Sequence, residues 1–89
     1  MADQFTEFKK CITWYKSQNA WCGSFDLEKT DDFKGICYSI QASPGQSAKI
    51  AKPEVAERLF KRIVKICEDN NIELKLVIKQ KLLAKGKIK

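Results

Sequence analysis

The four cysteines are the side chains of this 89-residue chain best suited to chemistry, because thiolates are nucleophiles and metal ligands. They lie at Cys11, Cys22, Cys37 and Cys67, and no two of them form the C-x-x-C pair that zinc sites built from four thiolates nearly always use. We therefore expect reduced thiols that act as small apolar groups in the core. A disulfide is the alternative, followed by a zinc site.

One cysteine stands in a short motif. Trp21-Cys22-Gly23 resembles the first three residues of the thioredoxin active site, W-C-G-x-C. Phe25 occupies the position of the resolving cysteine, and an amphipathic helical pattern precedes the motif where thioredoxin has an apolar strand. We interpret these residues as part of a strand that enters the core.

The sequence offers little for acid–base or phosphate chemistry. It contains no histidine, the residue that most often transfers protons near neutral pH. Asp31 and Asp32 are adjacent, so on an extended segment they point apart, and we expect them to be turn residues. The loop at 42–52 contains Pro44-Gly45 but neither glycine-rich phosphate motif. We predict a protein that is not an enzyme and that uses no cofactor or metal.

Positive charge is concentrated in the second half of the chain. The net charge is +6, and residues 45–89 contain 12 Lys and Arg residues against 5 acidic residues. Such a field attracts acidic partners, and salt screens it beyond about 8 Å. Solubilisation is the alternative role for any single lysine. The residues predicted to form a basic binding face are Arg58, Lys61, Arg62, Lys65, Lys75 and Lys79.

Aromatic residues are concentrated in the first half, where eight of the nine precede residue 39. Trp14 lies off the main apolar stripe of the first predicted helix. If it is exposed, it is a candidate anchor of the kind found at interface hot spots. The alternative is an aromatic side chain that folds back over a loop.

Hydrophobic periodicity predicts the elements. They are a helix over 4–17, strands over 21–27 and 33–41 joined as an antiparallel hairpin, a loop at 42–52, a helix over 53–69 and a strand over 72–79. Pro53 suits a first helical position, and Asn70-Asn71 suits a helix end. The predicted fold class is α+β, in the order α-β-β-α-β, with a three-stranded mixed sheet packed by two helices. Residues 1–79 would form one domain, and residues 80–89 a basic C-terminal tail or a short final helical turn.

These features together predict a small non-enzymatic binding protein. We expect a stoichiometric inhibitor or adaptor of a larger protein or nucleoprotein machine, with a basic face that binds an acidic protein surface. A non-sequence-specific binder of the DNA or RNA backbone is the alternative. Two unpaired sheet edges also allow a homodimer, through an edge or the long helix. We expect a cytoplasmic location and no membrane partner, because the sequence has no secretory signal pattern and no apolar run of about 18 residues.

Overall fold

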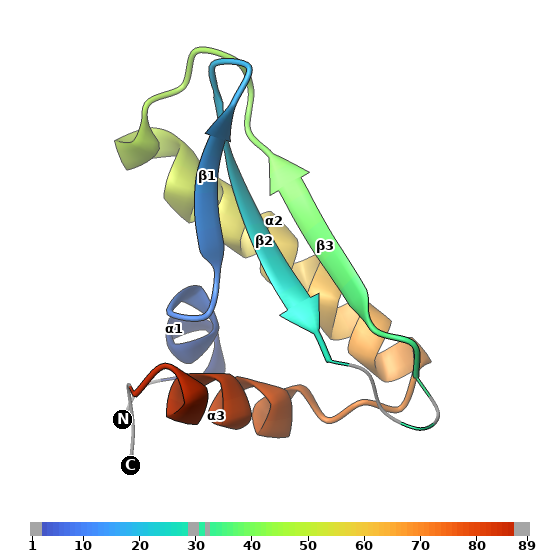
Figure 1. Ribbon diagram of the computed structural model, residues 1–89. Helices are drawn as coiled ribbons and strands as arrows, with labels where there is room; N and C mark the ends of the chain where they lie inside the picture. The colour runs from blue at the N-terminus through green and yellow to red at the C-terminus, as the bar shows by residue number, and fades with distance from the viewer. Residues whose placement is uncertain (1–2, 29–30, 32, 87–89) are drawn as a thin grey trace.

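The computed structural model describes residues 3–28, 31 and 33–86. The elements are α1 (Gln4–Lys9), β1 (Thr13–Ser17), β2 (Ala20–Leu27), β3 (Ile36–Gln41), α2 (Ala48–Asp69) and α3 (Leu74–Ala84). The strands form one antiparallel sheet in the order β1-β2-β3. Figure 1 shows α2 packed behind this sheet, with α1 and α3 at its lower end. Within the described residues, no helix is both long enough and apolar enough to cross a bilayer.

The predicted helix over 4–17 is wrong beyond Lys9. Asp3 caps the short α1, since its Oδ1 accepts a hydrogen bond of 2.7 Å from the Thr6 N–H. The run that begins at Thr13 is β-branched and aromatic, which favours the strand β1. Gln18 (φ 50°) and Asn19 (φ 63°) then form a two-residue hairpin turn. Both residues have a left-handed backbone, and they join two strands at the place where the predicted first helix would have ended.

The predicted hairpin between the next two strands is confirmed. β2 and β3 pair antiparallel, with Phe25 opposite Tyr38 and Leu27 opposite Ile36. Asp31 lies in a turn, as expected, whereas Asp32 is outside the described residues. The hairpin therefore places β3 at an edge of the sheet, next to β2 and away from β1.

The long helix begins earlier than predicted and ends where predicted. α2 starts at Ala48, so Pro53 lies inside the helix and not at its first position. Pro53 has no N–H to bond to the carbonyl one turn earlier, but the added first turn buries Ala51 against the two tryptophans and Ala42. At the other end Asn71 has φ 56°, and the Ile72 N–H donates to the Cys67 carbonyl at 2.8 Å, which closes a Schellman motif.

The predicted strand over 72–79 is wrong, because these residues lead into and form the helix α3. Leu74, Ile78 and Leu82 recur every four residues and are buried, whereas Leu76 is 51% exposed. The element order is therefore α-β-β-β-α-α and the sheet is purely antiparallel. The α+β class and the three-stranded sheet are confirmed. Residues 80–84 of the predicted tail continue α3, and residues 87–89 lie outside the described part.

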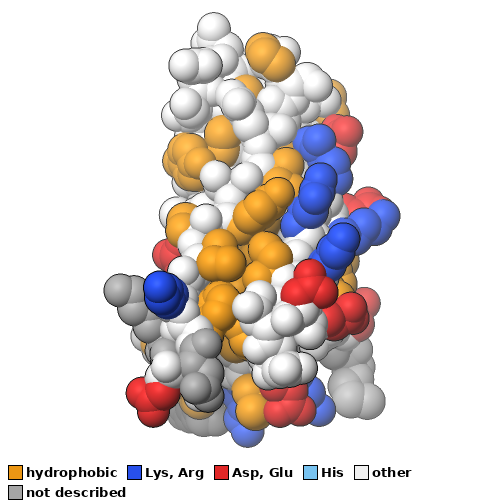
Figure 2. Space-filling view, turned by 90° about the vertical axis from the view of Figure 1, so that its right-hand side faces the viewer, with side chains coloured by type: hydrophobic (Ala, Val, Ile, Leu, Met, Phe, Trp, Pro, Cys, Tyr) orange, Lys and Arg blue, Asp and Glu red, His pale blue; other side chains and the backbone are white. Residues whose placement is uncertain are grey.

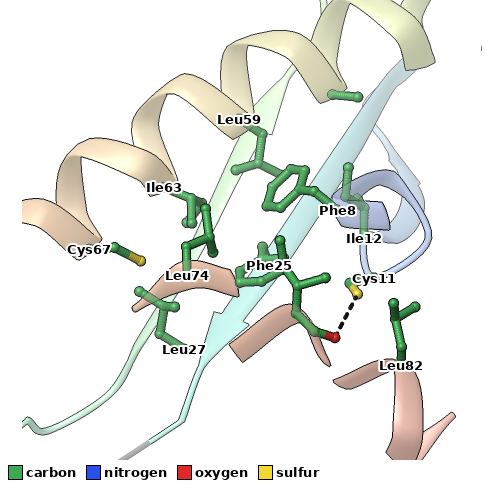
Figure 3. Close-up of a cluster of buried hydrophobic side chains, with 12 residues drawn as sticks. Phe8, Cys11, Ile12, Phe25, Leu27, Leu59, Ile63, Cys67, Leu74 and Leu82 are labelled. Atoms are coloured by element: carbon green, nitrogen blue, oxygen red, sulfur yellow. Dashed lines mark hydrogen bonds between the residues drawn. The ribbon is translucent and has the colours of Figure 1, made fainter. Parts of the chain in front are cut away.

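The core lies where the sheet, α2 and the two shorter helices meet, as Figure 3 shows. Phe8 of α1 stacks on Phe25 of β2 with 4.6 Å between ring centroids, and it meets Phe60 of α2 edge-on at 5.1 Å. Such pairs contribute about 0.5–1.5 kcal/mol each beyond the burial of their area. Leu59 and Ile63 fill the same core from α2, so the opposite side of that helix is left to solvent.

Candidate binding groove between α2 and β3

A groove with a volume of about 470 Å³ runs between the edge strand β3 and the long helix α2. Figure 2 shows this side of the molecule, where a band of hydrophobic side chains is bordered by a row of Lys and Arg side chains. The residues that line the groove are Tyr38, Ser39 and Ile40 of β3 and Arg58, Lys61 and Arg62 of α2. Apolar surface, hydroxyl groups and cations are thus available side by side.

The helix register explains why these cations border the groove. Leu59 and Ile63 are fully buried in the core, and the positions beside them turn outward toward β3. Arg58 is one such position, and its Nη2 donates a hydrogen bond of 3.4 Å to the carbonyl oxygen of Gln41. The guanidinium of Arg58 therefore lies at the free edge of β3.

Among the residues that the structure describes, no strand pairs with β3 on the side away from β2, so the backbone groups on that side have no strand partner. The Ala42 N–H donates to the Trp21 carbonyl at 2.9 Å, which identifies this pair as hydrogen-bonded across the β2–β3 ladder. Because such pairs alternate in antiparallel sheets, Tyr38 and Ile40 bond to β2, and Ser39 and Gln41 direct their backbone groups outward. The contact of Arg58 with the Gln41 carbonyl agrees with this alternation.

The positive charge of the groove is only slightly offset by acidic neighbours. Lys61 lies 3.5 Å from Glu57 of the preceding turn, and both side chains are mostly exposed. An exposed pair of this kind contributes about 0–1 kcal/mol and leaves both groups accessible. Across the residues that the structure describes, this is the one ion pair, so Arg58 and Arg62 keep their charge free for a ligand.

The structure places the basic residues predicted from the sequence on two different helices, and only some of them at the groove. Arg58, Lys61 and Arg62 meet at the groove, while Lys65 is exposed on α2 but does not line it. Lys75 and Lys79 are exposed on α3, which lies across the end of the sheet, and not on a strand beside α2 (Figure 1). The expected single basic face, shared by the predicted helix and the predicted strand, is therefore replaced by a smaller one on α2.

Trp14 is not an exposed anchor. It lies on β1, the edge strand opposite β3, and is half-buried against both hydrophobic clusters. The Lys52 Nζ lies 5.5 Å from the centroid of the Trp14 ring and 4.8 Å from that of Trp21, within cation–π range. Trp14 therefore packs across the sheet and covers the first turns of α2.

The expected burial of the cysteines is confirmed for Cys11, Cys22 and Cys67 and is wrong for Cys37, and all four thiols are free. Burial raises the pKa of the Cys11 and Cys67 thiols, and the Cys11 Sγ lies 4.0 Å from the Ile78 carbonyl oxygen (Figure 3). Cys22, of the motif that resembles thioredoxin, is buried in the central strand. Cys37 is exposed, and a hydrogen bond to the Asp26 carboxylate opposite it raises its pKa. The raised pKa values of Cys11, Cys37 and Cys67 disfavour the reactive thiolate at these three positions.

A second hollow, of about 570 Å³, lies beside the turn between α2 and α3. Phe33, Ile72 and Leu76 give it an apolar border, and Glu73 is the one charged side chain in its lining. Its chemistry is therefore unrelated to the basic groove.

Tyr38, Ser39 and Ile40 are the groove residues that sequence reasoning missed. The alternation of side chains along a strand is the signal that groups them, since Tyr38 and Ile40 pack against the core and Ser39 is exposed. Comparison of the chain with known protein families, with curated proteins and with solved structures finds no match. The groove is accordingly interpreted from its own geometry.

Proposed function

We propose that this protein is a non-enzymatic binding protein, an inhibitor or adaptor that covers an acidic site on a larger protein or nucleoprotein machine. The observation that carries the proposal is the groove between α2 and β3, where Arg58, Lys61 and Arg62 stand beside a free strand edge. The proposal locates the protein in the cytoplasm, a compartment that keeps its four free thiols reduced.

The residues of the groove supply two different contributions to binding. Arg58 and Arg62 present planar guanidinium groups that can bond to both oxygens of a carboxylate. Their field raises the encounter rate with an acidic surface and orients it on approach. Tyr38 and Ile40 are half-buried, so a partner that covers them also removes apolar surface from water.

A protein partner fits the groove better than a nucleic acid does. The outward N–H and C=O groups of Ser39 and Gln41 can both be matched by another polypeptide backbone, whereas phosphate oxygens only accept hydrogen bonds and leave the C=O groups without a donor. The lysines that would widen a phosphate-binding track, Lys75 and Lys79, lie on α3. Nucleic-acid binding is therefore the competing outcome of the test.

The test compares two probes and two charge reversals. A fluorescent glutamate-rich peptide and a DNA duplex of equal charge are titrated with the protein at two salt concentrations, and anisotropy is measured. We expect the peptide to bind, and Arg58→Glu/Arg62→Glu to weaken it at least about tenfold, which corresponds to about 1.4 kcal/mol.

The matched control is Lys75→Glu/Lys79→Glu, which changes the net charge equally at another element. We expect it to weaken binding of the peptide by less than about threefold, because these two lysines do not line the groove and act on the peptide only through a field that salt screens. Equal losses in the two variants would mean that net charge alone, and not the groove, attracts the peptide. Tighter binding of the duplex than of the peptide would contradict a protein partner.

A further inference from the structure

We infer that the partner is bound as an added β-strand: an extended acidic segment that pairs with the free edge of β3 and directs every second side chain toward the cations of α2. This inference rests on the proposed function and specifies the kind of segment that the groove takes. Strand addition of this type obtains affinity from main-chain hydrogen bonds and specificity from alternate side chains.

The backbone of β3 provides the first half of the site. β3 has six residues, with β2 on one side and no strand on the other among the described residues. Alternation of the ladder directs the N–H and C=O groups of Cys37, Ser39 and Gln41 toward that open side. A segment of about five or six residues, at about 3.4 Å per residue, matches this length of edge.

The cations of α2 provide the second half, and their spacing matches that of a strand. Arg58 and Arg62 are four residues apart on the helix, which is an axial rise of about 6 Å. Alternate side chains of a strand are about 6.8 Å apart and share one face. Figure 1 shows α2 running along β3 in the opposite sense, so acids at alternate positions of an added strand meet successive cations.

Charge argues against a second copy of this chain as the occupant. Two β3 edges paired around a two-fold axis would bring two sets of Arg58, Lys61 and Arg62 to the same seam. Like charges so placed repel, and the neighbouring Glu57 is the only acid paired with any of them among the described residues. An acidic segment of another protein removes the same repulsion by neutralising the cations.

Arg58 makes different contacts in the free protein and in the complex. In the free protein its Nη2 donates a hydrogen bond of 3.4 Å to the Gln41 carbonyl oxygen. This contact protects the edge of β3 from non-specific pairing with strands of other molecules. On strand addition the Gln41 carbonyl takes an N–H of the incoming backbone, and the guanidinium turns to a carboxylate of the same segment. The long hydrogen bond of the free protein is thereby replaced by a backbone hydrogen bond and by an ion pair between the guanidinium and the carboxylate.

The experiment uses a peptide of alternating Ser and Glu, and two copies that are N-methylated at every Glu or at every Ser. N–H groups of alternate residues in a strand point to opposite sides, so one methylated copy loses the bonds to β3 and the other retains them. We expect one copy to bind at least about tenfold more weakly than the other. In the bound state, exchange of the Ser39 amide hydrogen slows, whereas that of Tyr38, already bonded to β2, changes little.

The outcomes separate this inference from the proposed function. Equal affinity of the two methylated copies, whether retained or lost, overturns strand addition. If Arg58→Glu/Arg62→Glu still abolishes binding of the unmethylated peptide in that case, the proposed function stands. If the wild-type protein ignores the unmethylated peptide and binds the DNA duplex, both proposals are wrong.

Discussion

At the scale of single residues, Gly23 shows how closely the sheet is packed. A Cβ at this position would lie 2.9 Å from Cγ2 of Ile12 and 2.9 Å from Cζ3 of Trp14. Neither side chain can easily move, since Ile12 is buried and Trp14 packs against both hydrophobic clusters. We therefore expect Gly23→Ala to lower the free energy of unfolding by about 1–3 kcal/mol in urea denaturation.

Ser24→Ala is the control for this substitution. Ser24 is the next residue of β2, and its side chain lies on the opposite face of the sheet, beside Thr13 and Ser39. We expect a change of less than about 0.5 kcal/mol for Ser24→Ala. Unchanged stability of Gly23→Ala would contradict the contact with Trp14.

Cys37 offers a second test at this scale. It is the exposed cysteine, and the hydrogen bond to Asp26 raises its thiol pKa by favouring the protonated form. The thiolate fraction at pH 8 is therefore lower than for an ordinary cysteine, and the labelling rate rises as pH increases through the raised pKa. Asp26→Asn removes the carboxylate and lowers that pKa.

We expect Asp26→Asn to accelerate the labelling of Cys37 by a thiol reagent at pH 8, and the two rates to converge at strongly alkaline pH. The three buried cysteines serve as internal controls, because they are labelled only when the protein opens. A slower reaction of Cys37 in the variant would show that Asp26 does not suppress the thiolate.

At the scale of the elements, α3 is the segment whose sequence is most ambiguous. Ile72, Leu74, Leu76 and Ile78 alternate with other residues as in a strand, yet Leu74, Ile78 and Leu82 also follow a helical repeat. The segment is helical because α3 packs against α1 and buries Leu74, Ile78 and Leu82 in the core cluster that also contains Phe8 and Cys11. The two interpretations differ most at Leu76, which a strand would bury together with Ile78.

Alanine substitutions at Leu76 and Ile78 distinguish the helix from the strand. Ile78 is 1% exposed and Leu76 is 51% exposed. We expect Ile78→Ala to destabilise the protein by about 2–4 kcal/mol and Leu76→Ala by less than about 1 kcal/mol, measured by urea denaturation. Similar losses at both positions would favour a strand and contradict α3.

Two other elements show where local signals competed with tertiary packing. Thr13, Trp14 and Tyr15 carry a strong strand propensity, but Phe8, Ile12 and Tyr15 also share a helical face, and that spacing favoured one long helix. Pro53 is an ordinary signal for a helix start, and only the burial of Ala51 and Val55 against the tryptophans explains a start five residues earlier. The pairing of β1 with β2 is local to one hairpin, whereas the contacts of Ala51 with the tryptophans join residues far apart in the chain.

At the scale of the whole molecule, only one side of the groove could be predicted from the sequence. Arg58, Lys61 and Arg62 were predictable, because their spacing on an amphipathic helix places them opposite the apolar stripe. The groove residues on β3 were not predictable, because the predicted strand over 72–79 could have paired with that edge of a mixed sheet. In the described part of the chain this edge has no strand beside it, because β1 pairs with the other side of β2 and residues 74–84 form a helix.

Chemical-shift mapping by NMR is the most direct measurement of where an acidic partner binds. The ¹⁵N-labelled protein is titrated with the peptide of alternating Ser and Glu, and backbone shifts are followed at each residue. We expect the changes to be concentrated at Tyr38–Gln41 and Arg58–Arg62, the two sides of the groove. Changes centred on β1, or on Lys75 and Lys79 of α3, would contradict a binding site between α2 and β3.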